Sequence, residues 1–130
     1  MTEEERRAIE WECTRLINLY ANLNDEARWE EAAALYAEDG LMTRPTAPDA
    51  PIVGREALLA AFLARPPRTS QHFVGNIVVN VESGSEARAK SVILLFTSKE
   101  GPPLIGTYRD SFVRTGEGWR FSERRGALTW

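Results

Sequence analysis

QHFVGNIVVNVE, residues 71–82, is the first of four segments that decide the fold of this chain. The others are ARAKSVILLFTS (87–98), LIGTYRDSFVRT (104–115) and GWRFSERRGALT (118–129). All four are rich in the β-branched and aromatic residues that favour strands. Three short breaks separate them: Ser83–Ser85, Lys99–Pro103 and Gly116–Gly118, each with the composition and length of a hairpin turn. The pattern predicts an antiparallel meander of four strands.

The first half of the chain predicts helices. Thr2 and Glu5 have the spacing of a capping box. Apolar residues then recur at helical spacing, and the helix should end near Asn24. The residues of this stripe are Ile9, Cys13, Leu16, Ile17, Tyr20 and Leu23.

Two shorter helices are expected further along, over Arg28–Ala37 and Arg55–Ala64. In the second, Trp29, Ala32, Ala33 and Tyr36 mark the buried face; in the third, Leu58, Leu59, Phe62 and Leu63 point inward. Between them, Leu41–Thr43 suits a short strand, and the proline-rich stretch Arg44–Pro51 suits an irregular loop. Helices followed by strands indicate one α+β domain over residues 1–130, with the helices packed on one face of the antiparallel sheet.

Composition limits the classes of partner. The net charge is −3 and the basic residues are interspersed with acidic ones, so nucleic acid and anionic membranes are not expected partners. No segment approaches the roughly 18 apolar residues that span a bilayer, and the charged N-terminus lacks a signal-peptide pattern. The single cysteine, Cys13, cannot form an internal disulfide; it should be a buried, inert thiol in a cytoplasmic protein.

His72 is the only histidine, and it lies at the start of the first long strand, where alternation places it on one face with Val74, Asn76 and Val78. An imidazole can take or give a proton near neutrality. Asp25 follows the first helix and could orient that imidazole, although an aspartate at this position could equally cap the second helix.

Other polar residues have two readings as well. Arg44 and Tyr108 are candidates for stabilising an oxyanion. Asp110, Arg114 and Arg120 suit a cross-strand ladder, with Asp110 paired to an arginine of the next strand. Nothing in the sequence matches a phosphate loop, a cysteine cluster or a serine-nucleophile motif, so neither a metal nor a cofactor is expected.

Four segments together resemble the SnoaL-like domain family of the NTF2-like superfamily. They are Tyr20–Asp39, Val53–Ala57, Gln71–Asn76 and Gly106–Arg124, and they cover nearly the whole chain. The resemblance implies an NTF2-like cone, in which the bent sheet and the helices surround a pocket.

In members of the scytalone dehydratase and dehydrochlorinase type, an Asp–His dyad abstracts a proton, and Asp25 and His72 fall where that dyad would lie. The resemblance then implies a lyase, dehydratase or isomerase acting on a hydrophobic, cyclic or polyketide-like small molecule. Arg44, Tyr108, Asn24 and Trp29 are the substrate-binding candidates. The departures are a missing second histidine and Asn24 in place of a tyrosine, which argue against scytalone itself as substrate.

The same pattern resembles the β subunits of aromatic-ring-hydroxylating dioxygenases, which share the fold but are mainly structural. A non-catalytic ligand-binding or structural subunit is therefore the alternative, and fold alone does not decide between the two. Under either interpretation the resemblance implies a homodimer or homotrimer, since members of the family commonly pair through the open face of the sheet. Apolar residues on both faces of Val92–Phe96 support a second buried face.

Overall fold

The computed structural model describes residues 1–130 and contains three helices and one six-stranded sheet. The helices are α1 (Glu3–Asp25), α2 (Trp29–Ala33) and α3 (Arg55–Leu63). The strands are β1 (Tyr36–Arg44), β2 (Ala47–Val53), β3 (Gln71–Val81), β4 (Glu86–Phe96), β5 (Leu104–Thr115) and β6 (Gly118–Leu128). The strand order is β2-β1-β6-β5-β4-β3. Only β1 and β6 run parallel; the other neighbours are antiparallel. The predicted α+β class and the β3–β6 meander are confirmed.

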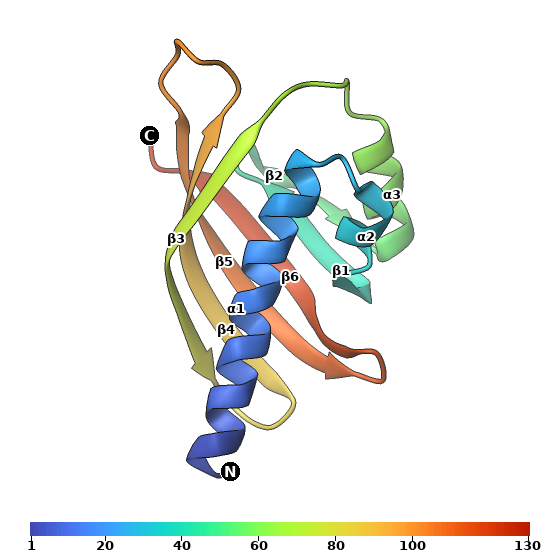
Figure 1. The fold of residues 1–130 in the computed structure, drawn as a ribbon. Helices are drawn as coiled ribbons and strands as arrows, with labels where there is room; N and C mark the ends of the chain where they lie inside the picture. Colours follow the sequence, from blue (N-terminus) through green and yellow to red (C-terminus); the bar gives the residue numbers. More distant parts are fainter.

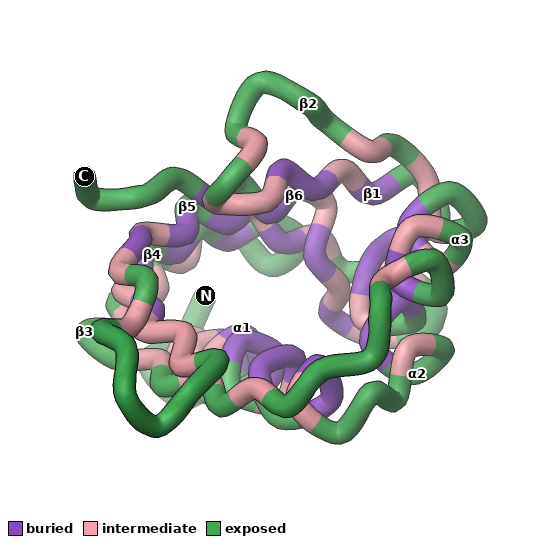
Figure 2. The backbone as a smooth tube through the Cα atoms, turned by 90° about the horizontal axis from the view of Figure 1, so that it is seen from above, coloured by how far each residue is buried: buried purple, intermediate pink, exposed green.

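The sheet curves around α1. Figure 1 shows α1 crossing the sheet, with α2 and α3 beside β1. From above, the strands and helices form a closed outline, and α1, α3 and β6 each contain buried residues (Figure 2). Tyr20 of α1 lies at the centre of this packing, because its ring meets Tyr36, Phe62 and Phe121 edge-on. None of the helices has both the length and the apolar character needed to cross a membrane.

Helix α1 begins as the sequence predicts. The Thr2 hydroxyl accepts from the Glu5 amide at 3.1 Å, and the Glu5 carboxylate accepts from the Thr2 amide at the same distance. These two bonds satisfy amides that a helix start otherwise leaves unpaired. Cys13 is fully buried on the apolar face of the helix, as expected.

The second helix is shorter than the sequence pattern indicates. It ends at Ala33, and residues 36–40 belong to strand β1 instead of the expected helix over Arg28–Ala37. The cause is tertiary: Tyr36 pairs with Phe121 of β6, whose amide donates to the Leu35 carbonyl at 2.9 Å. Pairing with a buried strand outweighs the local helical pattern.

The loop expected at Arg44–Pro51 is largely a strand. Residues 47–53 form β2, which pairs only with β1 and is therefore an edge strand. Proline removes one backbone donor, which an edge strand tolerates on its free side, so Pro48 and Pro51 do not prevent pairing.

Strand β3 contains an irregularity that changes which residues face inward. The register with β4 shifts between Gly75 and Val78, and Asn76 has a positive φ of 52°. This bulge reverses the alternation of side chains along the strand. Val78 is therefore 58% exposed and, contrary to the prediction, does not share a face with His72 and Val74.

Helix α3 ends one residue before the expected Ala64 and has a narrower buried face than expected. Leu58 and Phe62 are fully buried and Leu59 is half-buried, whereas Leu63 is 60% exposed. Each residue turns by about 100° around a helix, so Leu63, directly after Phe62, leaves the apolar stripe.

Gly126 of β6 allows the turn between β1 and β2 to lie close to the sheet. A Cβ atom at this position would come within 2.8 Å of the Pro45 ring, and the Gly126 amide donates to the Thr43 hydroxyl at 3.1 Å. This contact positions Pro45 and Thr46, which form part of the wall described next.

Candidate active site

One cavity of about 370 Å³ lies between α1, the sheet and the segment that follows α3. A cavity of this size suits a small organic ligand. Every strand except β2 contributes to its wall, together with the end of α1. The lining residues are Tyr20, Ala21, Asn24, Met42, Arg44, Pro45, Thr46, Arg65, Pro66, Arg68, His72, Ile93, Leu95, Leu104, Tyr108 and Arg124.

His72 and Asp25 are in direct contact at the wall of this cavity. Nδ1 of His72 lies 2.5 Å from Oδ1 of Asp25, and each side chain is only 12% exposed. Because Nδ1 is engaged, Nε2 is the ring nitrogen left for a ligand. The arrangement is that of an oriented imidazole, in which the carboxylate fixes the ring and the tautomer.

Three further donors hold the Asp25 carboxylate. The His72 backbone amide donates to Oδ2 at 2.7 Å, and the Ser70 hydroxyl donates to Oδ1 at 2.9 Å. The Gln71 side-chain amide donates to Oδ2 at 3.4 Å. The carboxylate thus ties the end of α1 to the start of β3. It does not cap α2, whose N-cap residue is Arg28 and has no side-chain cap bond, so the helix-capping reading is wrong.

Arg44 and Tyr108, two of the predicted substrate contacts, line the same cavity as His72. Burial raises the pKa of Tyr108 to about 12, so the phenol keeps its proton at neutral pH and can donate a hydrogen bond. The Nε atom of Arg44 is buried and has no partner in the protein.

Asn24 also lines the cavity, but its side chain is already engaged. Its Nδ2 donates to the Tyr20 carbonyl at 2.9 Å, and its Oδ1 accepts from Arg65 at 2.9 Å. Asn24 therefore positions Arg65.

Trp29 lies outside this cavity, unlike the other predicted substrate contacts. The Trp29 ring packs against Phe62. The Arg65 guanidinium lies over the Trp29 ring, 5.2 Å from the ring centroid. Trp29 lines an adjacent hollow of about 280 Å³, which shares five lining residues with the cavity, namely Asn24, Arg65, Pro66, Arg68 and His72.

Arg124 is a cavity residue that alternation along β6 does not reveal. Trp119 and Phe121 are buried as predicted, so strict alternation would put Glu123 inward and Arg124 outward. The register with β5 shifts at this point: Phe121 pairs with Phe112, but Glu123 pairs with Ser111. The extra residue in β6 turns Arg124 inward, where it is 1% exposed.

Arg124 makes the predicted ion pair with Asp110. Its Nε donates to Oδ1 of Asp110 at 2.9 Å, and its guanidinium lies 3.9 Å from the centroid of the Tyr108 ring. Burial, the largest single cause, lowers the pKa of Arg124, but attraction to Asp110 and to three nearby tyrosines together outweighs it. The pKa is raised, so the guanidinium stays charged. Arg114 and Arg120 do not join this pair, so the wider ladder is wrong.

Arg65 and Arg68 also line the cavity, and the sequence pattern did not single them out. Both flank the Pro66–Pro67 pair that stops α3, so the only sequence signal was a basic residue on each side of a helix break. No group of three or more His, Cys, Asp or Glu side chains lies close enough together to hold a metal ion.

The fold and the cavity define the class of protein: an NTF2-like, cystatin-like α+β domain with a ligand-sized internal pocket. The sequence matches the SnoaL-like domain family over residues 5–125, and the chain belongs to that family.

Three solved structures illustrate the similarity. A provisionally assigned scytalone dehydratase from Novosphingobium aromaticivorans is 27% identical with a TM-score of 0.85, covering 99% of this chain and 89% of that one. An NTF2-like protein with a cystatin-like fold from the same species is 29% identical with a TM-score of 0.80, covering 97% and 82%. Hexachlorocyclohexane dehydrochlorinase LinA-type3 from Novosphingobium barchaimii is 16% identical with a TM-score of 0.85, covering 99% and 92%, a likeness of fold alone. No curated protein matches the sequence.

Proposed function

We propose that this protein is a cofactor-independent lyase, dehydratase or isomerase that uses His72 as a general base on a small, largely hydrophobic molecule. The observation that carries the proposal is the contact between His72 and Asp25 at the wall of the cavity. Similarity to a provisionally assigned scytalone dehydratase supports the same reaction class.

The proton transfer follows from the geometry of the imidazole. Asp25 accepts the Nδ1 proton, which leaves the Nε2 lone pair to take a proton from a substrate carbon. The imidazolium that forms is stabilised by the adjacent carboxylate, which need not itself be protonated. General-base catalysis of this kind contributes about 10²–10⁴-fold to the rate.

The reaction can then follow one of two courses, which differ in where the electron pair of the broken C–H bond goes. In an elimination it forms a C=C bond as the leaving group departs with its own electron pair; a hydroxyl takes the proton from Nε2 and leaves as water. In an isomerisation the same proton returns to a different carbon. Negative charge that develops on oxygen would be stabilised by three side chains. Tyr108 keeps its proton because it is buried and can donate a hydrogen bond. Arg44 and Arg124 each have an unpaired donor atom.

One observation also fits a non-catalytic ligand carrier or structural subunit. Asp25 holds the start of β3 through the His72 amide and the Ser70 hydroxyl, a structural role that needs no chemistry. A carrier would keep the cavity and these bonds but would not abstract a proton.

Deuterium exchange separates the two functions whatever the leaving group is. The protein is incubated in D₂O with a panel of cyclic ketones and β-hydroxy ketones, and mass spectrometry follows deuterium incorporation and loss of water. We expect the wild-type protein to accelerate exchange of at least one compound, and His72→Gln to reduce that acceleration by about 10² or more.

Arg88→Gln, an exposed change on β4 far from the cavity, is the matched control and should leave the rate unchanged. Equal exchange rates for the wild-type and His72→Gln proteins would refute the general-base role and leave the carrier function.

A further inference from the structure

The wall of the cavity has a one-sided charge. Four of its 16 lining residues are arginines, namely Arg44, Arg65, Arg68 and Arg124, and none is an aspartate or a glutamate. This local excess of positive charge contrasts with the net charge of −3 for the whole chain. A cavity lined by one sign of charge raises the local concentration of the opposite sign.

Most of this charge has no counter-ion in the protein. Arg124 pairs with Asp110, which lies behind it, and any charge on His72 is balanced by Asp25. Arg44, Arg65 and Arg68 make no ion pair; the only hydrogen bond from these three side chains joins Arg65 to the neutral Asn24 amide. Burial lowers the pKa of Arg65, and repulsion from Arg44 and Arg68 lowers it further.

Two donor atoms at the wall are buried and unpaired. They are Nε of Arg44 and Nη2 of Arg124, and the Arg124 residue is only 1% exposed. Buried guanidinium donors are normally satisfied, because leaving one without a partner costs its lost hydration. Acceptor oxygens of a ligand in the cavity would satisfy these two donors.

Another part of the lining is apolar. Met42, Ile93, Leu95 and Leu104 contribute side chains without charge or hydrogen-bonding groups. The cavity, at about 370 Å³, therefore combines an apolar region sized for a ring with a cluster of guanidinium donors.

We propose that the ligand of this cavity is a ring-sized carboxylic acid, bound as its carboxylate by Arg44 and its neighbouring arginines with the apolar body against β4 and β5. Planar guanidinium groups match a carboxylate with two parallel hydrogen bonds. This inference rests on the proposed function for its meaning: the carboxylate would anchor the substrate while a C–H bond of the ring faces His72. The substrate would then be an amphipathic anion, not an uncharged hydrophobic molecule.

Paired ligands test the inference directly. Binding of benzoate, cyclohexanecarboxylate and 1-naphthoate is measured by calorimetry beside that of the three corresponding primary amides, which keep shape but lack charge. We expect at least one acid to bind about tenfold or more tightly than its amide, since charge-assisted hydrogen bonds are roughly twice as strong as neutral ones. Arg44→Gln should remove most of that preference.

Arg109→Gln is the matched control, because Arg109 is exposed on β5 and makes no ion pair. It should leave the preference unchanged. The inference is overturned if no acid binds, if acids and amides bind equally, or if Arg44→Gln and Arg109→Gln have the same effect. It is also overturned if inorganic phosphate competes as well as the organic acids, since the site would then recognise anions in general.

Binding and chemistry fail separately in this design. His72→Gln should abolish deuterium exchange yet keep the preference for acid over amide. If the wild-type protein shows the preference but no exchange with the panel ketones or with cyclic keto acids, the carboxylate site stands and the catalytic proposal does not.

Discussion

His72 Nδ1 lies 2.5 Å from Asp25 Oδ1, a contact between residues 47 positions apart that joins the end of α1 to the start of β3. The same carboxylate accepts the His72 backbone amide, so one aspartate fixes both the ring and the strand that carries it. The orientation of the imidazole is thereby built into the junction of the two elements.

Asp25→Asn should alter the tautomer of His72 while leaving the fold in place. An amide side chain can donate to Nδ1, which would move the ring proton to Nε2 and remove the free lone pair from the cavity. We expect ¹⁵N NMR of the ring to show the Nδ1–H tautomer in the wild-type protein and the other in the variant, with deuterium exchange reduced by about 10²-fold or more. Ser70→Ala removes only one bond to the carboxylate and should keep the tautomer; unchanged ring shifts in Asp25→Asn would contradict this account.

Asp110→Asn should strongly destabilise the protein. The change leaves the Arg124 guanidinium buried without its counter-ion, and breaking a buried pair from one side costs about 3–5 kcal/mol. The double variant Asp110→Asn/Arg124→Gln should lose less than the sum of the two single variants, because the pair acts as a unit. Urea unfolding measures all three free energies. Strict additivity would show that the pair is energetically independent.

Stability should decline at alkaline pH because of Cys13. Burial raises the pKa of this thiol from 9.0 to about 12, so the folded protein keeps a proton that the unfolded chain releases near pH 9. This contribution to stability is therefore complete below pH 9.0 and is lost as the pH rises toward 12, at up to about 1.4 kcal/mol per pH unit. Cys13→Ala should flatten the unfolding free energy over this range. An identical slope in the variant would assign the decline to other groups, such as the buried tyrosines.

Gly126→Ala should disturb the cavity wall as well as the stability. The new methyl group would meet the Pro45 ring at 2.8 Å, so the β1–β2 turn must shift, at about 1–3 kcal/mol. Gly75→Ala, where an added Cβ meets no atom within 4 Å, is the matched control and should be close to neutral. Thermal unfolding and ligand affinity both report the effect; equal melting temperatures for the two variants would refute the close approach.

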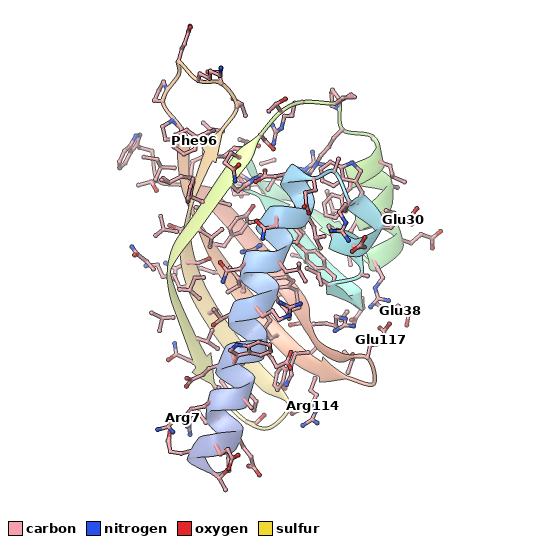
Figure 3. The ribbon with its side chains drawn as sticks, viewed as in Figure 1. Arg7, Glu30, Glu38, Phe96, Arg114 and Glu117 are labelled. Carbon is pink, nitrogen blue, oxygen red and sulfur yellow. The ribbon has the colours of Figure 1, made fainter.

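The outer face of the sheet should mediate self-association, in line with the expected homodimer or homotrimer. Phe73, Leu94 and Ile105 are neighbours across β3, β4 and β5, Phe73 is 63% exposed, and it meets Phe96 edge-on. Phe96 lies at the opposite end of the molecule from Arg7 of α1 (Figure 3). A contiguous apolar patch of this kind is typical of an interface.

Phe73→Glu should therefore shift the protein to a monomer in sedimentation velocity, because it places a charge in the patch. Leu63→Glu changes an equally exposed apolar residue of α3, away from the sheet, and should have no such effect. A wild-type monomer at high concentration would rule out the interface.

The parts of the fold that local patterns determine were predicted well. Hydrophobic alternation and hairpin turns set β3 to β6, and the capping box with its apolar stripe set α1, because these signals come from residues close in sequence. The errors lie where distant pairing competes. Tyr36 and the prolines of β2 adopt strand conformations only because β6 and β1 are beside them.

The candidate site divides in the same way. The sequence by itself determined that one histidine and one early aspartate were available for proton transfer, and it placed Arg44 and Tyr108 among the cavity residues. Only the tertiary structure decided that Arg124 turns inward, that Trp29 faces a different hollow and that three arginines share one cavity without counter-ions. The reason is physical: a one-residue bulge reverses every side chain that follows it, and the charge of a cavity depends on which strands meet there, neither of which a local pattern contains.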